Sequence, residues 1–295
     1  MFSIIIPTLN NLKYLKICIN SINKNSNYNH EIIPHVNIGD DGTLEYLREN
    51  NIKYTHTNYN SGICKGMNLA SKIATNDYIL YAHDDFYFCP DWDTILKSEV
   101  DKIGHNMFYL SGTMVHNGQI NFNCGDSAEY FDEKKFLNNY KNYNFYDFQG
   151  STWAPHLIHK DIWNKVGGFS EEFYPGTGSD PDLNMKLWML GVRIFKGIND
   201  FKVYHFGSIV TRKFKDNNNI ITESGSRGGK IFLLKWGFSI KFFKKFFLKA
   251  GTKYDKPLSD PKKNIRYITS YYLNKINYIY IKYIYNFNNK NKLID

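Results

Sequence analysis

The alternation of short apolar runs with amphipathic stretches over the first hundred residues is the feature that most constrains the fold. Residues 2–6 predict a buried strand, and the apolar residues that follow recur at the spacing of a helix face. The same order then repeats, with strands predicted at 32–38, 52–56 and 78–82 and helices at 43–49 and 64–74. Such alternation is typical of parallel sheets, because each helix returns the chain to the edge where the next strand starts. We therefore expect an α/β fold with a mixed, mainly parallel sheet flanked by helices.

The alternation loosens in the second third of the chain. Residues 118–149 are polar, aromatic and irregular, and we interpret them as an insertion that shapes a pocket. Around this segment we predict strands at 107–115, 153–158, 192–196 and 202–204, and helices at 91–103 and 180–190. The chain then divides into a domain of residues 1–230, with halves at 1–105 and 106–230, and an extension of residues 231–295.

The extension is strongly basic. Residues 230–295 carry 15 Lys and Arg against 3 Asp and Glu, whereas the rest of the chain carries 22 against 25. Residues 231–249, IFLLKWGFSIKFFKKFFLK, predict one basic amphipathic helix. Such a helix can lie in a membrane interface, and it can equally pack its Phe face on the rest of the chain.

Composition excludes several classes of protein. Hydrophobic residues at 42% and charged residues at 22% are ordinary for a globular chain and exclude a disordered one. No apolar run is long enough to span a membrane, and the N-terminus lacks the regions of a signal peptide. The cysteines occur singly, so we expect them to be reduced and buried in a cytoplasmic or membrane-peripheral protein. Without an RNA-binding aromatic motif or a zinc knuckle, the basic extension does not point to a nucleic-acid partner.

Polar residues follow the predicted strands at the point where each strand ends. Thr8 and Asn10 follow the first strand, Asp40 and Asp41 the second, and Asp84 with its neighbour Asp85 the fourth. Ligands of open α/β sheets bind beyond the carboxyl ends of the strands, so these clusters indicate a nucleotide site. The chain has neither Gly-x-Gly-x-x-Gly after its first strand nor Gly-x-x-x-x-Gly-Lys-Ser/Thr, which argues against a dinucleotide dehydrogenase and a P-loop enzyme.

Five segments in one order carry a family resemblance. They are DDGT at 40–43, NSGICKGMN at 60–68, HDD at 83–85, Gly167-Gly168-Phe169 leading to Asp182, and His205 with Gly207-Ser208. Together they resemble the family 2 glycosyltransferases of the GT-A fold, a Rossmann-like nucleotide-binding fold. The resemblance covers residues 1–240 and implies a metal-dependent, inverting glycosyltransferase of glycan biosynthesis. It would move a sugar from a nucleotide sugar, UDP-linked by preference, to a hydroxyl of a glycan, lipid-linked or protein acceptor.

The resemblance implies a metal site. Negative charge grows on the departing diphosphate during sugar transfer, and a divalent cation neutralises it. Asp85 is the implied metal ligand, with Asp84 on the ribose or the metal shell. The family motif is commonly Asp-x-Asp, so His83 leaves fewer negative charges for the ion. His205 is similar to a histidine that closes the metal or diphosphate site, and imidazole favours Mn²⁺ over the alternative, Mg²⁺.

The same resemblance implies how the base is bound. Asp40 resembles the family's base-contacting aspartate, whereas Asp41 is interpreted as holding the turn. The chain around Pro7, Thr8 and Asn10 would line the same base.

Further residues are implied for the diphosphate and the sugar. Lys65 matches a position where a basic side chain commonly faces the diphosphate, and Asn68 either lies near the nucleotide or is a surface helix residue. Arg212 opens a segment, 212–230, with the composition of a lid and cations for phosphate. Trp153 falls where the family runs a loop under the donor sugar, or it is a core tryptophan.

The segment Gly178-Ser-Asp-Pro-Asp-Leu183 resembles the family's Glu-Asp-x-Asp-Leu. Asp180 matches the general base that takes the proton of the acceptor hydroxyl. Ser179 replaces the usual Glu, and Asp182 either contacts the acceptor or is a carboxylate favoured at a helix N-terminus. Because two motif positions are replaced, the alternative is a non-catalytic nucleotide- or carbohydrate-binding module on a degenerate scaffold.

Overall fold

One mixed sheet organises the protein, and the computed structural model describes residues 1–143, 146–207 and 220–291. Its strands are β1 (Phe2–Leu9), β2 (Glu31–Asn37), β3 (Thr55–Thr57), β4 (Tyr78–Tyr81), β5 (Phe86–Phe88), β6 (Phe108–Val115), β7 (Phe148–Gln149), β8 (His156–His159) and β9 (Ile194–His205). Within the described ranges the order is β3-β2-β1-β4-β8-β6-β9-β5, and β7 pairs with β9.

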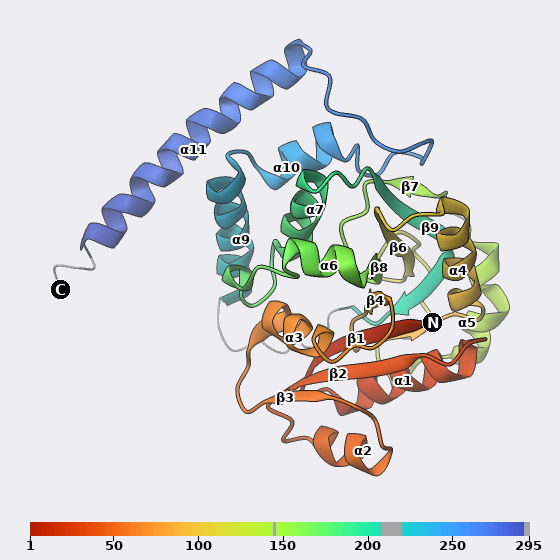
Figure 1. The fold of residues 1–295 in the computed structure, drawn as a ribbon. Helices are drawn as coiled ribbons and strands as arrows, with labels where there is room; N and C mark the ends of the chain where they lie inside the picture. The colour runs from red at the N-terminus through yellow and green to blue at the C-terminus, as the bar shows by residue number, and fades with distance from the viewer. Residues whose placement is uncertain (144–145, 208–219, 292–295) are drawn as a thin grey trace.

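Helices flank this sheet (Figure 1). They are α1 (Leu12–Asn25), α2 (Thr43–Glu49), α3 (Gly62–Ser71), α4 (Trp92–Ile103), α5 (Glu133–Asn139), α6 (Lys160–Val166), α7 (Ser179–Met189), α9 (Ile220–Trp236), α10 (Ile240–Phe242) and α11 (Ile265–Asn291). The predicted α/β fold is confirmed, because strands and helices alternate from β1 to β4 as the hydrophobic pattern indicates.

The N-terminal strands pair in parallel. β1 lies between β2 and β4, and β3 pairs with β2. Ile4, Ile5 and Ile6 are fully buried, as expected for a parallel strand covered on both faces. The strand order therefore runs outward from β1 through β2 to β3 and then continues with β4 on the other side of β1. Open α/β sheets bind ligands at such a switch point between neighbouring strands.

Antiparallel pairing enters with the second half of the chain. β8 runs antiparallel to both β4 and β6, and β9 runs parallel to β6 and antiparallel to β5. The two short strands predicted at 192–196 and 202–204 are a single strand, so that prediction is wrong. The register of β6 against β9 shifts between Ser111 and Thr113, which marks a β-bulge. Thr113 Oγ1 donates to the Ile198 carbonyl at 2.9 Å beside this bulge.

The insertion at 118–149 builds a second apolar cluster. Phe136 and Tyr140 pack there with Tyr204 and Phe206 from the end of β9 and with Tyr14 of α1. α5 lies in this segment and is absent from the sequence prediction, because its seven residues bury only one side chain, Phe136. The insertion is thus anchored to the sheet edge where β9 ends.

The predicted single helix at 231–249 is wrong. α9 ends at Trp236, Gly237 adopts a left-handed conformation with φ of +78°, and Ser239 caps α10. A π-helical turn, Phe243–Phe247, follows α10. The Phe side chains of this segment pack into the main core, so its apolar face meets the rest of the chain. The boundary predicted at residue 230 also falls inside α9.

The glycine-rich stretch before residue 230 is helical where the structure describes it. Residues 220–230 belong to α9, although the sequence composition suggests a lid. A Cβ at Gly228 would stand 2.1 Å from the Thr177 carbonyl oxygen. Glycine is therefore needed here for close approach of α9 to the turn before α7, rather than for a mobile loop.

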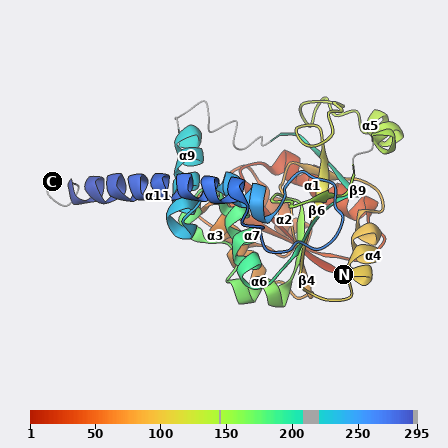
Figure 2. The ribbon, with the colours of Figure 1, turned by 90° about the horizontal axis from the view of Figure 1, so that it is seen from above.

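α11 extends away from the sheet domain, as Figure 1 and the view from above in Figure 2 show. Its first turns are attached through Tyr267 and Tyr271, which pack against the main core, and through Asn274, which accepts a bond from the Ser239 amide at 2.7 Å. No helix in the described part of the chain is long and apolar enough to cross a membrane. Cys18, Cys64, Cys89 and Cys124 are all free and buried, as predicted.

Burial of the extension predicts a stability effect. Phe243 is fully buried, so Phe243→Ala should lower the free energy of unfolding by about 3–5 kcal/mol through lost contacts and a cavity. Tyr280→Ala, at a side chain 61% exposed, should change it by less than about 0.5 kcal/mol. Urea unfolding followed by circular dichroism measures both. Equal stabilities of the two variants would show that the extension is not part of the core.

Candidate active site

The carboxyl ends of β1 and β4 meet at Thr8 and Asp84. Thr8 Oγ1 donates to Asp84 Oδ2 at 2.6 Å, and both side chains are buried. Burial, and then the neighbouring charge of Asp85, raise the pKa of Asp84 to about 7, against the bond from Thr8. Two adjacent buried carboxylates are costly without positive charge, so this position favours a cation.

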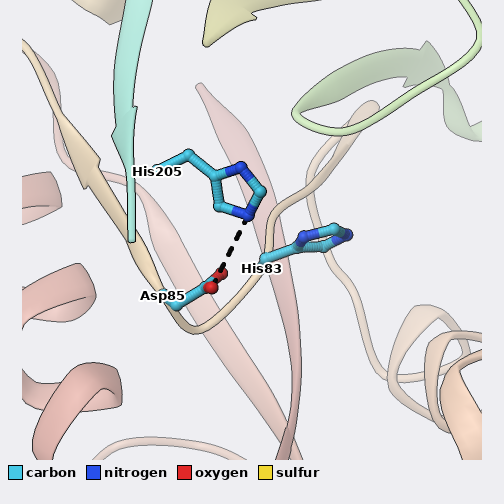
Figure 3. A group of neighbouring side chains, drawn as sticks. All are labelled: His83, Asp85 and His205. Carbon is cyan, nitrogen blue, oxygen red and sulfur yellow. Dashed lines mark ion pairs between the residues drawn. The ribbon is translucent and has the colours of Figure 1, made fainter. Parts of the chain in front are cut away.

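His83, Asp85 and His205 form a potential metal-binding group (Figure 3). One ligand atom from each lies within 4.8 Å of the others. The antiparallel pairing of Phe86 with His205 brings the end of β9 beside the loop after β4. As a result, Asp85 Oδ2 lies 3.5 Å from His205 Nε2.

The insertion orients His205. Its Nδ1 lies 3.1 Å from the Asn117 carbonyl oxygen, and Asn117 Nδ2 donates to the His205 carbonyl at 3.1 Å. Because a carbonyl only accepts, Nδ1 carries a proton in this contact and Nε2 is left to face Asp85. This arrangement is typical of a metal-ligating histidine held by a backbone carbonyl.

His83 is the functional candidate that sequence reasoning set aside. Burial lowers its pKa to about 4, so its imidazole is neutral at pH 7 and retains a lone pair. Its ring stacks on Phe86 at 4.8 Å. Two imidazoles and a carboxylate suit Mn²⁺ better than Mg²⁺, which prefers oxygen ligands. The replacement in the HDD motif therefore changes the type of donor instead of removing one.

Asp180 forms the second carboxylate centre, at the start of α7. Its Oδ1 is buried and has no hydrogen-bond partner in the described part of the chain. Burial raises the pKa of Asp180 to about 7, and the positive charge of Lys244, from the π-helical turn, opposes that rise. Nothing in the sequence pattern relates Lys244 to Asp180.

The charges of both carboxylate centres act on one side chain. Tyr81, at the end of β4, is buried, and its phenol pKa is raised by burial and then by the charges of Asp180, Asp84 and Asp85. Carboxylates separated by almost a hundred residues therefore both influence a single tyrosine.

Further buried polar atoms are candidates for ligand contacts. His156 lies 5.1 Å from Tyr81 between ring centroids, and His156 Nδ1 bonds to the Tyr109 hydroxyl at 2.9 Å. His156 Nε2, Trp153 Nε1 and both amide atoms of Asn184 have no hydrogen-bond partner among the residues described. The Trp153 ring itself stacks on Phe148 at 5.1 Å, as a core tryptophan would. Unpaired buried polar groups are rare, so this group is suited to a polar ligand.

The loops proposed for the base are held by Asn10 and Asp41. Asn10 Oδ1 accepts bonds from the amides of Gly39 and Asp40, at 2.9 and 3.1 Å. Asp41 accepts from the Leu12 amide at 2.8 Å and thus holds the turn, as the sequence suggested. The Asp40 carboxylate remains exposed beside these loops. Pro7 lies in β1, within the parallel pairing to β2.

Asn68 has a structural role. Its side chain accepts from the Phe169 amide and donates to the Phe169 carbonyl, both at 2.9 Å, and so ties α3 to the turn after α6. Lys65 Nζ donates to the Tyr59 hydroxyl at 2.8 Å and is open to solvent. Arg212 lies outside the described residues.

Asp182 is structural as well. It is fully buried and accepts bonds from Ser170 Oγ at 2.6 Å and Trp236 Nε1 at 2.8 Å, while Lys235 Nζ lies 3.1 Å away. These contacts hold α9 against α7, so the carboxylate is not available to an acceptor. Of the two acidic residues in the segment, only Asp180 keeps an unpaired oxygen.

Comparison with known protein families assigns the chain to one of them. Residues 3–162, more than half of its length, match the family model of glycosyl transferase family 2. The chain therefore belongs to glycosyl transferase family 2 and is a glycosyltransferase. No curated protein sequence matches it.

Solved structures show the same GT-A fold. TarS 1-349 of S. aureus in complex with UDP has a TM-score of 0.53 and 18% identity, over 83% of this chain and 72% of that one. The same protein in complex with UDP-GlcNAc gives 0.52 and 18%, over 82% and 74%. GalNAc-T7 with UDP, GalNAc and Mn²⁺ gives 0.53 and 16%, over 70% of this chain and 43% of that one.

The ligand group predicts selective metal binding. His83→Ala and Asp85→Asn should each weaken Mn²⁺ binding by at least about tenfold, because each removes one donor. His56→Ala, at an exposed histidine of β3, should bind Mn²⁺ like the unchanged protein. Titration of Mn²⁺ followed by electron paramagnetic resonance measures the free ion. Unaltered affinity in both variants would exclude this group as the site.

Proposed function

We propose that the protein is a metal-dependent, inverting glycosyltransferase that moves a sugar from a UDP-linked donor to a hydroxyl of a glycan, lipid-linked or protein acceptor. The observation that supports the proposal is the presence of two carboxylate centres whose charges both reach the buried Tyr81. One centre offers ligands for a cation, and the other offers an unpaired carboxylate oxygen for a proton. Residues 1–230 would form the catalytic domain, in halves 1–105 and 106–230, with 231–295 as the extension.

The donor would bind along the carboxyl ends of β1, β2 and β4. Asp40 would accept from the base, with Pro7, Thr8 and Asn10 beside it, and Asp84 would contact the ribose or the metal shell. Lys65 and Arg212 would face the diphosphate, and Asn68 would act only through the turn that it holds. The UDP complexes of TarS and GalNAc-T7 support a uridine donor, since these structures share the fold.

The residues that would hold the cation are His83, Asp85 and His205. Their donor set fits Mn²⁺, with Mg²⁺ as the alternative, and GalNAc-T7 has been solved with Mn²⁺. A cation bound there would neutralise negative charge on the departing diphosphate. The chain's own part is to keep His83 neutral and to aim His205 Nε2 through the Asn117 carbonyl.

Asp180 would act as general base. It would take the proton of the acceptor hydroxyl while the oxygen forms a bond to the anomeric carbon, on the face opposite the breaking bond to the diphosphate. One such displacement inverts the anomeric centre. A pKa of about 7 suits this role, because about half of the carboxylate is then ionised near neutral pH and it is still basic enough to hold a proton.

The unpaired polar atoms of Trp153, His156 and Asn184 would bind the sugar. Trp153 Nε1 and His156 Nε2 are potential partners for hydroxyl groups, and Asn184 adds an amide one helical turn after Asp180. Pairing with a polyhydroxylated ligand would satisfy these atoms without a change of fold.

Removal of the base separates an enzyme from a binding module. Asp180→Asn should lower transfer or hydrolysis of a UDP-sugar by about 10²–10⁴-fold, because the amide cannot accept the proton. Its affinity for UDP should not change. A panel of nucleotide sugars, assayed for release of nucleoside diphosphate with and without Mn²⁺, supplies the activity. Turnover that is equal in both proteins would argue against Asp180 as the base, whereas UDP binding without turnover in either would favour the non-catalytic alternative.

The pH dependence of turnover tests the link between Lys244 and Asp180. A base must be ionised, so activity falls as the pH drops through the pKa of Asp180, about 7. Lys244→Met removes a positive charge that lowers this pKa, so the acid limb of the kcat profile should move to higher pH with the alkaline plateau retained.

Lys245→Met is the matched control, at an exposed lysine of the same turn. It should leave the profile unchanged. A plateau lost in Lys244→Met without any displacement of the acid limb would mean that the lysine acts by another route.

A further inference from the structure

α11 has one face attached to the domain and another that no described element covers. On the attached side, Tyr267 lies 5.1 Å from Phe242 between ring centroids, and Asn274 accepts from the Ser239 amide. Beyond these turns the helix extends past the domain (Figure 2).

The uncovered face carries a continuous apolar stripe. It consists of residues spaced by three or four positions, which places them on one side of a helix: Ile265, Ile268, Tyr272, Ile276, Ile279 and Tyr283. Their side chains are between 40% and 75% exposed. We call this set the outer stripe. At about 1.5 Å per residue it is roughly 27 Å long. Exposed apolar surface of this extent marks an interaction site.

The charged residues of α11 indicate which kind of partner fits the outer stripe. The helix carries Arg266, Lys275, Lys282 and Lys290 and contains no Asp or Glu. Lys275 and Lys282 lie one heptad apart beside the outer stripe, and each ammonium lies 5.6 Å from the Tyr278 ring. A second copy of this helix would bring like charges together without a compensating acid. An anionic lipid surface complements both the cations and the apolar stripe.

We propose that α11 is a membrane-interface helix that binds anionic phospholipid bilayers. The outer stripe lies against the acyl chains, the lysines contact lipid phosphates, and the tyrosines occupy the boundary that suits their apolar rings and polar hydroxyls. This surface is separate from segment 231–249, whose Phe side chains are buried in the core. It does not depend on the transfer reaction.

Co-sedimentation of the full chain with vesicles tests the proposal. The protein should bind vesicles of phosphatidylglycerol and phosphatidylcholine, bind pure phosphatidylcholine at least about tenfold more weakly, and lose affinity as salt rises. The double variant Ile276→Ser, Ile279→Ser should bind the mixed vesicles at least about tenfold more weakly. Lys275→Gln with Lys282→Gln should weaken binding and flatten its dependence on salt.

Tyr130→Ser is the control, at a side chain 80% exposed in the insertion, and should bind like the unchanged protein. The changed positions are solvent-exposed except Lys275, which is half-buried, and circular dichroism checks that the variants fold. Equal vesicle binding by the stripe variant and the unchanged protein would overturn the proposal. A dimer in light scattering that the stripe variant abolishes, with no vesicle binding, would assign the stripe to a second copy instead. Binding to RNA but not to vesicles would equally overturn it.

Discussion

The burial of two adjacent carboxylates, Asp84 and Asp85, is the constraint on which the rest of the site depends. Removing them from water raises the pKa of Asp84 and costs free energy unless the surroundings compensate. The fold compensates in part with the Thr8 hydroxyl from β1, and it places the His205 imidazole of β9 at 3.5 Å from Asp85. A cation between the same residues would complete that compensation. These buried carboxylates therefore lie at the point where the parallel part of the sheet meets its antiparallel part.

Segments far along the chain serve this position. β9 delivers His205 through its pairing with β5, and the insertion orients the ring through the Asn117 carbonyl. The extension takes part from the other side, because Trp236 bonds to Asp182 and so fixes α7, which carries Asp180. Lys244 then tunes the Asp180 carboxylate from the π-helical turn. Residues beyond 230 are thus built into the candidate site, whereas the outer half of α11 remains free for a different surface.

Long periodic segments were predictable and long-range electrostatics were not. The strands and helices from β1 to β4 follow the hydrophobic pattern because burial against one sheet dictates which positions are apolar, whereas the three-residue strand β5 was not predicted. The same pattern failed at 231–249, where Gly237 and Ser239 end one helix and begin another within a continuous Phe-rich run. The lid predicted from composition also differs from the structure near residue 228, where the glycine allows close packing of α9. His83 was set aside because a motif records residue type, whereas its value as a donor depends on its neutral state in the folded protein.

The sequence alone determined the α/β alternation, the polar ends of the strands and the order of the family motifs, because these depend on local periodicity and spacing. Tertiary structure decided which polar groups meet: Asp180 rather than Asp182 keeps a free oxygen, and Asn68 is bound by the Phe169 backbone. It also decided which face of the basic extension is buried and which is exposed. The physical reason is that burial and the positions of neighbouring groups exist only after distant segments have packed together. These two factors set the pKa of a carboxylate and decide what an apolar face packs against.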